Sequence, residues 1–108
     1  MQYWVYLVCA IALEVAGTTS MKISAGFTKL APSVLIFVFY AASFVMLTFA
    51  IKKIDVSVAY AIWSGIGTAL IACIGMLYFR EPATAVKFVS IGLILLGVVG
   101  LNLPGARA

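Results

Sequence analysis

The sequence predicts an all-α membrane protein with four transmembrane helices. Hydrophobic residues make up 66% of the chain and charged residues 9%, whereas about a quarter of the residues in a soluble domain are charged. The charges are also segregated, because residues 30–51, 56–79 and 88–106 contain none and residues 1–21 contain only Glu14. A helix of about 20 apolar residues crosses a hydrocarbon core of about 30 Å, so each stretch is long enough to span a bilayer.

The first two helices are expected at residues 3–21 and 33–51. Lys22 ends the first helix at the membrane interface. The loop that follows contains Gly26, which favours a turn, and Pro32, which favours the start of a helix. The sequence therefore predicts a short polar connection between two membrane-spanning segments.

The last two helices are expected at residues 56–79 and 85–103. The segment KKID connects the second helix tightly to the third, and the segment REPAT turns the chain into the fourth. Because the loops are this short, residues 1–108 are expected to form a single transmembrane domain, with almost nothing outside the bilayer.

The composition excludes several classes of function. The chain has no histidine, and Cys9 and Cys73 lie in separate apolar segments, so we expect no metal site. It has no glycine-rich phosphate loop and no hydrophilic segment long enough to fold a nucleotide domain, so we expect no cofactor and no enzymatic activity. The net charge of +4 lies in the loops, where it is expected to meet the headgroups of the lipid bilayer rather than nucleic acid.

The loop charges bear on topology, because the orientation of a membrane protein follows its Lys and Arg residues. Three of these residues fall on one predicted side and four on the other: Lys52, Lys53 and Arg107 against Lys22, Lys29, Arg80 and Lys87. The chain also lacks the internal inverted repeat from which many transporters are built. Both observations favour an antiparallel, dual-topology homodimer, in which two copies insert in opposite directions, and an unequal partner subunit remains an alternative.

Glu14 is the unusual residue of the first helix. It lies eleven residues after Tyr3, about 16 Å along a helix, and therefore near the middle of the bilayer. An ionised carboxylate there costs at least about 2.5 kcal/mol. Desolvation favours the protonated form of a carboxyl group, and a nearby cation favours the ionised form. A proton and a cationic ligand would therefore compete for the same oxygen atoms, which is enough to couple their exchange.

Small residues surround Glu14 on its helix face. Ala10, Gly17 and Thr18 share that face by helical spacing, which fits either an open cavity or close helix packing. In the third helix, Tyr60 and Trp63 also share a face, and aromatic rings attract desolvated cations by about 2 kcal/mol.

Several further residues complete the pattern. Tyr40 and Ser43 repeat the same spacing in the second helix, and Gly65 and Gly67 weaken the third helix enough to permit a kink. Each of these signals alone indicates core packing more than chemistry.

Together, the motifs LEVAGTTSMK, GFTKLAPS, YAASF, AYAIWSGIGT and the late GVVGLN resemble the small multidrug resistance transporters over nearly the whole chain. This resemblance implies a proton-coupled antiporter of four-helix subunits, which works as an antiparallel dimer in the bacterial inner membrane. It implies that Glu14 of each subunit binds both the proton and the substrate.

The resemblance also implies roles for other residues. The substrate cavity would be lined by Trp63, Tyr60, Tyr40, Ser43, Thr18, Gly17, Ala10 and Ser64. Gly65 and Gly67 match a kink in the third helix. Ser90 and Gly97 match a dimer contact on the fourth helix, although Ser90 stands where the family often has glycine.

The substrate branch follows from a few positions. Ala16, Gly17 and Trp63-Ser64-Gly65 resemble the branch that exports quaternary ammonium drugs and dyes, rather than the branch that exports guanidinium. Val45 replaces a second tryptophan of one branch, Trp4 stands where a tyrosine is common, and Asp55 replaces a frequent proline. The first two departures bear on the range of substrates.

Three other functions remain as alternatives: a guanidinium exporter of the same family, a proton-conducting rotor subunit, and a holin-like or structural membrane subunit. A rotor subunit and a holin-like or structural subunit would not need the carboxylate of Glu14 beside the aromatic pair Tyr60 and Trp63. Drug-stimulated proton release from the purified protein distinguishes a transporter from both.

Overall fold

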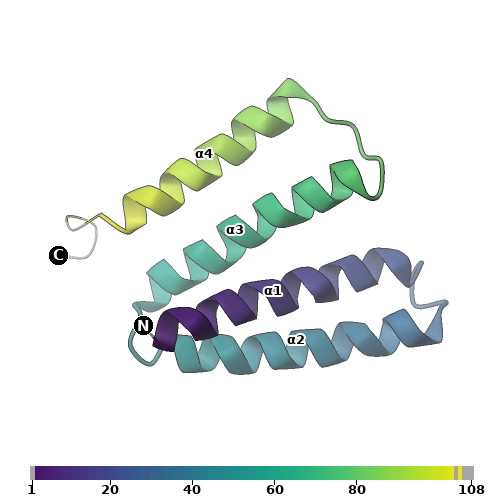
Figure 1. The fold of residues 1–108 in the computed structure, drawn as a ribbon, viewed down its shortest axis with the longest axis horizontal. Helices are drawn as coiled ribbons and strands as arrows, with labels where there is room; N and C mark the ends of the chain where they lie inside the picture. The colour runs from purple at the N-terminus through teal and green to yellow at the C-terminus, as the bar shows by residue number, and fades with distance from the viewer. Residues whose placement is uncertain (1, 104, 106–108) are drawn as a thin grey trace.

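The computed structural model describes residues 2–103 and 105, and its described part is all-helical (Figure 1). Four helices follow one another along the chain: α1 (Gln2–Ile23), α2 (Leu30–Ala50), α3 (Val56–Leu77) and α4 (Ala85–Leu101). The predicted all-α class with four helices is confirmed. Helices α1 and α3 run in one direction and α2 and α4 in the other, so the α1–α2 and α3–α4 loops lie at the same end of the molecule (Figure 1).

Three of the helices are long and apolar enough to cross a membrane. Mean hydropathy reaches 1.5 in α1, 2.2 in α2 and 1.7 in α3 over a membrane-length window. Helix α4 is apolar but has only 17 residues, the lower end of the spanning range of about 17–25 residues. A fourth crossing by α4 therefore remains a prediction.

The start of α2 and the end of α3 differ from the positions that hydropathy predicted. Helix α2 begins at Leu30, before the expected Ser33, because Pro32 fits inside a first helical turn, where its missing N–H is not needed. Helix α3 ends at Leu77 instead of residue 79. Shortly after this end, Arg80 adopts a φ of 58° and reverses the chain towards α4.

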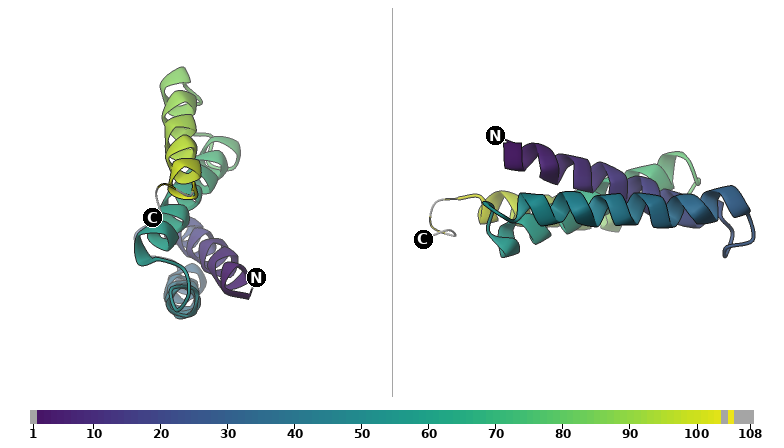
Figure 2. Two further views of the ribbon diagram at one scale, coloured as in Figure 1. Left: turned by 90° about the vertical axis from the view of Figure 1, so that its left-hand side faces the viewer. Right: turned by 90° about the horizontal axis from the view of Figure 1, so that it is seen from below.

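The packing is uneven along the chain. Helix α1 packs most extensively on α2, and α3 contacts both α1 and α4. The core lies among α1, the end of α2 and the start of α3, where Leu7, Ile11, Ala50, Val58 and Ile62 are buried. The arrangement is flat, with Cα extents of 47 × 35 × 18 Å, and the end-on view shows α4 extending away from the α1–α2 pair (Figure 2).

Helix α4 contributes no buried residue to this subunit. It packs closely on α3 at Gly65, where an added Cβ would lie 2.8 Å from Cγ2 of Val98 and 3.1 Å from Cγ2 of Ile94. The absence of a side chain at Gly65 therefore sets the distance between α3 and α4, and the remaining faces of α4 are left uncovered within the subunit.

Candidate functional site

A hydrogen-bonded chain of side chains joins α1 to α2 around Glu14. The Thr18 hydroxyl, one turn further along α1, donates to Oε1 of Glu14 at 2.9 Å. The same hydroxyl group is hydrogen-bonded to the Tyr40 hydroxyl on α2. The i, i+4 spacing of Glu14 and Thr18 places both side chains on one helix face, so the carboxylate is oriented by its own helix and linked to the next.

The other carboxylate oxygen faces α3. A Cβ added at Gly67 would lie only 2.9 Å from Oε2 of Glu14, a distance that real Cβ atoms essentially never show. Gly67 therefore leaves the space that the carboxylate occupies. Glu14 itself is partly buried, and its carboxylate lies between Thr18 of its own helix and Gly67 of α3.

An open cavity of about 340 Å³ adjoins the carboxylate. It is lined by Glu14, Thr18, Trp63, Ser64, Gly67, Thr68 and Ile71, and we call it the Glu14 cavity. Sites for small organic ligands measure about 300–1,000 Å³ and are mostly apolar with a few polar groups. The cavity of a single subunit is thus near the lower end of that range, and it has one carboxylate in its wall.

Trp63 is the aromatic residue that lines the Glu14 cavity, and further rings of α2 and α3 lie next to it, although the predicted Tyr40 and Tyr60 do not line the cavity in this subunit. The Trp63 ring lies 5.4 Å from the Tyr60 ring, edge to face, and 6.0 Å from the Phe44 ring. Phe44 in turn stacks on Tyr40 at 6.2 Å. Among the described residues the Trp63 Nε1 atom is buried and has no hydrogen-bond partner, and Tyr60 is 58% exposed. These rings therefore form a series of neighbouring aromatic side chains that runs from Tyr60 through Trp63 and Phe44 to Tyr40.

The sequence analysis did not identify Phe44, Thr68 or Ile71 as candidates. Phe44 follows Tyr40 by one helical turn, so the spacing that drew attention to Tyr40 also indicated Phe44. Thr68 and Ile71 continue the face of α3 that carries Ser64. Their only signal was helical periodicity, which also describes ordinary packing residues.

Three predicted cavity residues pack α1 against α2 in this subunit instead of lining the cavity. Ser43 is fully buried, and its hydroxyl donates to the Ala10 carbonyl oxygen at 2.7 Å. A Cβ at Gly17 would lie 3.3 Å from Cβ of Phe39 and 3.4 Å from the Tyr40 ring. These residues therefore bring Tyr40 close to α1 and support the cavity from behind.

The remaining predicted residues lie on α3 and α4. Ser64 lines the cavity, and its hydroxyl donates to the Tyr60 carbonyl oxygen at 2.8 Å. Helix α3 is continuous through Gly65 and Gly67, and only Gly67 borders the cavity. Ser90 is exposed, and an added Cβ at Gly97 would meet nothing within 4 Å. Both lie on faces of α4 that the described subunit leaves uncovered.

Groups that could hold a metal ion are absent from residues 2–103 and 105, in which no three His, Cys, Asp or Glu side chains cluster. The arrangement offers a different chemistry. One carboxylate, with one oxygen held by a hydroxyl and the other beside a glycine, borders a cavity with aromatic and aliphatic walls. Such a site can bind a cation with apolar substituents, or a proton.

The chain is similar to known proteins over most of its length. The family described as Small Multidrug Resistance protein matches residues 2–94. The uncharacterized membrane protein YvaE of Bacillus subtilis is 58% identical over 100 residues, which cover 93% of this chain and 84% of that protein. The quaternary ammonium compound-resistance protein QacE of Escherichia coli is 47% identical over 95% of this chain and 94% of that protein. The multidrug resistance protein mmr of Mycolicibacterium paratuberculosis is 46% identical, covering 96% and 98%.

Proposed function

The chain belongs to the small multidrug resistance family, and from that premise we propose that it is a proton-coupled antiporter of lipophilic quaternary ammonium cations. It would export drugs, antiseptics and dyes across the bacterial inner membrane in exchange for protons. The observation that carries the proposal is the position of Glu14. Its carboxylate lies at the junction of three helices, on a cavity bordered by the Trp63 ring.

Coupling follows from competition at one carboxylate. When Glu14 is protonated, it has no charge with which to hold a cation. When it is ionised, its cost in a low-dielectric site is offset by a bound cation. Proton and cation therefore bind alternately, and each displaces the other. Thr18 donates to the ionised form and keeps the carboxylate pointed at the cavity in both steps.

The cavity wall favours a quaternary ammonium over a guanidinium. A quaternary ammonium has no N–H group, so it loses no hydrogen bonds when apolar groups surround it. A guanidinium has several N–H donors, each of which is costly to leave unpaired. Trp63, which lines the Glu14 cavity beside Tyr60 and Phe44, can hold the first cation by cation–π attraction. The apolar wall at Ile71 accommodates its substituents.

The working unit of the proposal is an antiparallel homodimer. Three features support it: the near-equal loop charges, the cavity that a single subunit leaves open, and the uncovered faces of α4 at Ser90 and Gly97. In this dimer, one Glu14 from each subunit would face a shared substrate, and the kink at Gly65 and Gly67 would form as α3 repacks during exchange.

Transport in liposomes tests the function directly. The purified chain is reconstituted, a pH gradient is imposed, and uptake of radiolabelled tetrapropylammonium is compared with uptake of guanidinium. We expect proton-driven uptake of the first cation and little of the second. Glu14→Gln should abolish uptake, because an amide neither binds nor releases the proton. Proton-driven uptake by the Gln variant at the wild-type rate would refute the proposal, and preference for guanidinium would place the chain in the other branch.

A further inference from the structure

A second cavity continues from the Glu14 cavity towards the α3–α4 loop. This mouth cavity has a volume of about 170 Å³ and is lined by residues that include Thr18, Lys22, Ile71, Gly75 and Glu81. Thr18 and Ile71 also line the Glu14 cavity. The two cavities are therefore neighbouring sections of one groove between α1 and α3, which leads from Glu14 to the end of the molecule.

The backbone after α3 brings Glu81 back over this groove. Arg80 adopts a positive φ of 58°, a conformation uncommon for a residue with a side chain. The Glu81 N–H then donates to the Gly75 carbonyl oxygen at 2.9 Å. A Cβ at Gly75 would lie 2.8 Å from the Glu81 carboxyl carbon, so the carboxylate rests directly on the helix where a side chain is missing.

Helix stability does not explain a carboxylate in this position. The C-terminal end of a helix carries partial negative charge, and an acidic side chain there is unfavourable. Lys22 lines the same mouth cavity, but no ion pair joins it to Glu81 in the described part of the chain. Lys87 instead donates from its Nζ to the Pro82 carbonyl oxygen at 2.7 Å. The carboxylate of Glu81 therefore remains available to a ligand in the groove.

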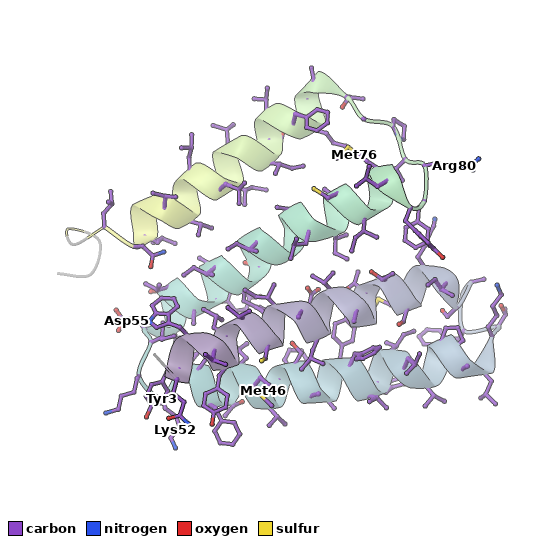
Figure 3. The ribbon with its side chains drawn as sticks, viewed as in Figure 1. Tyr3, Met46, Lys52, Asp55, Met76 and Arg80 are labelled. Carbon is purple, nitrogen blue, oxygen red and sulfur yellow. The ribbon has the colours of Figure 1, made fainter. Side chains whose placement is uncertain are left out.

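The carboxylate of Glu81 lies at an end of the molecule where the other charged side chains are cationic. The end of the molecule with the α1–α2 and α3–α4 loops carries four cationic side chains: Lys22, Lys29, Arg80 and Lys87. Figure 3 shows Arg80 at this end and Lys52 and Asp55 at the opposite one. The chain has only three acidic residues, Glu14, Asp55 and Glu81. Within the subunit, Glu81 is thus the single carboxylate at this end, where it offsets the repulsion that a cation meets on approaching the groove.

We propose that Glu81 is a second cation site, which attracts the organic cation at the mouth of the groove and passes it along Thr18 and Ile71 to Glu14. This role of Glu81 rests on the proposed transport function. Glu81 is exposed, so its effect is a weak attraction that raises the rate of cation capture and is screened by salt. In the antiparallel dimer each face of the membrane carries one such mouth, so cations are captured and released on both sides.

Kinetics of Glu81→Gln in liposomes test the proposal. Initial rates of tetrapropylammonium uptake are measured under a fixed pH gradient at low and at moderate ionic strength. We expect KM to rise roughly threefold to tenfold at low salt, with kcat within about twofold, and the difference to shrink as salt is added. Asp55→Asn removes the same charge from a residue that lines neither section of the groove, and it should leave KM unchanged. Glu81→Asp should retain most of the wild-type KM.

Two further variants separate this role from a structural one. Lys22→Gln introduced together with Glu81→Gln should restore much of the lost KM, because it removes the neighbouring repulsion. Gly75→Ala should displace the carboxylate and raise KM in the same salt-dependent way. A loss of kcat that does not depend on salt, or equal kinetics for Glu81→Gln and Asp55→Asn, would overturn the proposal. If Glu14→Gln is inactive while Glu81→Gln matches the wild type, only this inference fails; if the wild type shows no uptake, the transport function fails.

Discussion

Replacing Gly67 with alanine changes the cation site without touching a charged or aromatic residue. The added Cβ would lie 2.9 Å from Oε2 of Glu14, and ordinary contacts begin at 3.4 Å. The carboxylate is the flexible end of its side chain, so it is the group that moves. It must retreat by about 0.5–1 Å from α3, away from the cavity that Trp63 and Ser64 border.

The size of the effect follows from the electrostatics of that displacement. At an effective dielectric constant of about 20, a cation about 4 Å from a carboxylate is stabilised by about 4 kcal/mol. Lengthening the separation to about 4.5–5 Å removes about 0.5–0.8 kcal/mol. Because 1.4 kcal/mol corresponds to a factor of ten, the Gly67→Ala variant should bind the cation about twofold to fourfold more weakly. Alanine is about 1 kcal/mol more favourable than glycine within a helix, so the fold should not be weakened.

Binding and stability are measured on the same samples to check this. Tetrapropylammonium affinity is determined by calorimetry in lipid nanodiscs at one fixed pH for all variants, and thermal unfolding is followed in parallel. Gly92→Ala is the matched control, because a Cβ there meets nothing within 4 Å in the subunit. Unchanged affinity in Gly67→Ala, or an equal loss in Gly92→Ala, would show that Gly67 does not set the position of the Glu14 carboxylate.

Three other predictions concern titration, packing and topology. Cation affinity should increase as pH rises, because protons compete with the cation for Glu14 in the proposed mechanism; a pH-independent affinity would contradict competition. Ser43→Ala should destabilise the subunit by about 1 kcal/mol, because it leaves the Ala10 carbonyl oxygen without its buried donor, and unfolding in detergent measures this. Two lysines added beside Lys52 and Lys53 should force one orientation and abolish transport until an oppositely biased copy is co-expressed; reporter fusions at the C-terminus give the readout, and wild-type activity from a single orientation would refute dual topology.

Hydropathy predicted the helices well because each one is mostly apolar and is separated from the next by charged or turn-forming residues. The same pattern was less informative about where they end. Pro32 was expected to lie at the start of α2, yet it lies within the first turn. The N–H groups of the first turn make no hydrogen bond within the helix, so proline, which lacks this group, is tolerated there. The end of α4 at Leu101 was missed because no charged residue follows it before Arg107.

The site illustrates what helical spacing leaves undetermined. Residues three and four apart share a face, so Ser43 and Phe44 were equally compatible with a face that includes Tyr40. In the structure, Ser43 points into the α1–α2 contact and Phe44 reaches Trp63. The distinction depends on how the two helices cross, which is a property of three-dimensional packing. Glu81 was overlooked for a similar reason, because its position over Gly75 requires the reversal at Arg80.

Two glycines that are two residues apart give α3 close contacts on two of its sides. Successive helical residues are separated by about 100°, so Gly65 and Gly67 lie on nearly opposite sides, one against Val98 of α4 and the other against the Glu14 carboxylate. Neither has a side chain whose rotamers could absorb a displacement. Any rotation of α3 that follows a movement of α4 therefore changes the space available to the carboxylate immediately. A movement of α4 is thereby transmitted through the backbone of α3 to the Glu14 carboxylate.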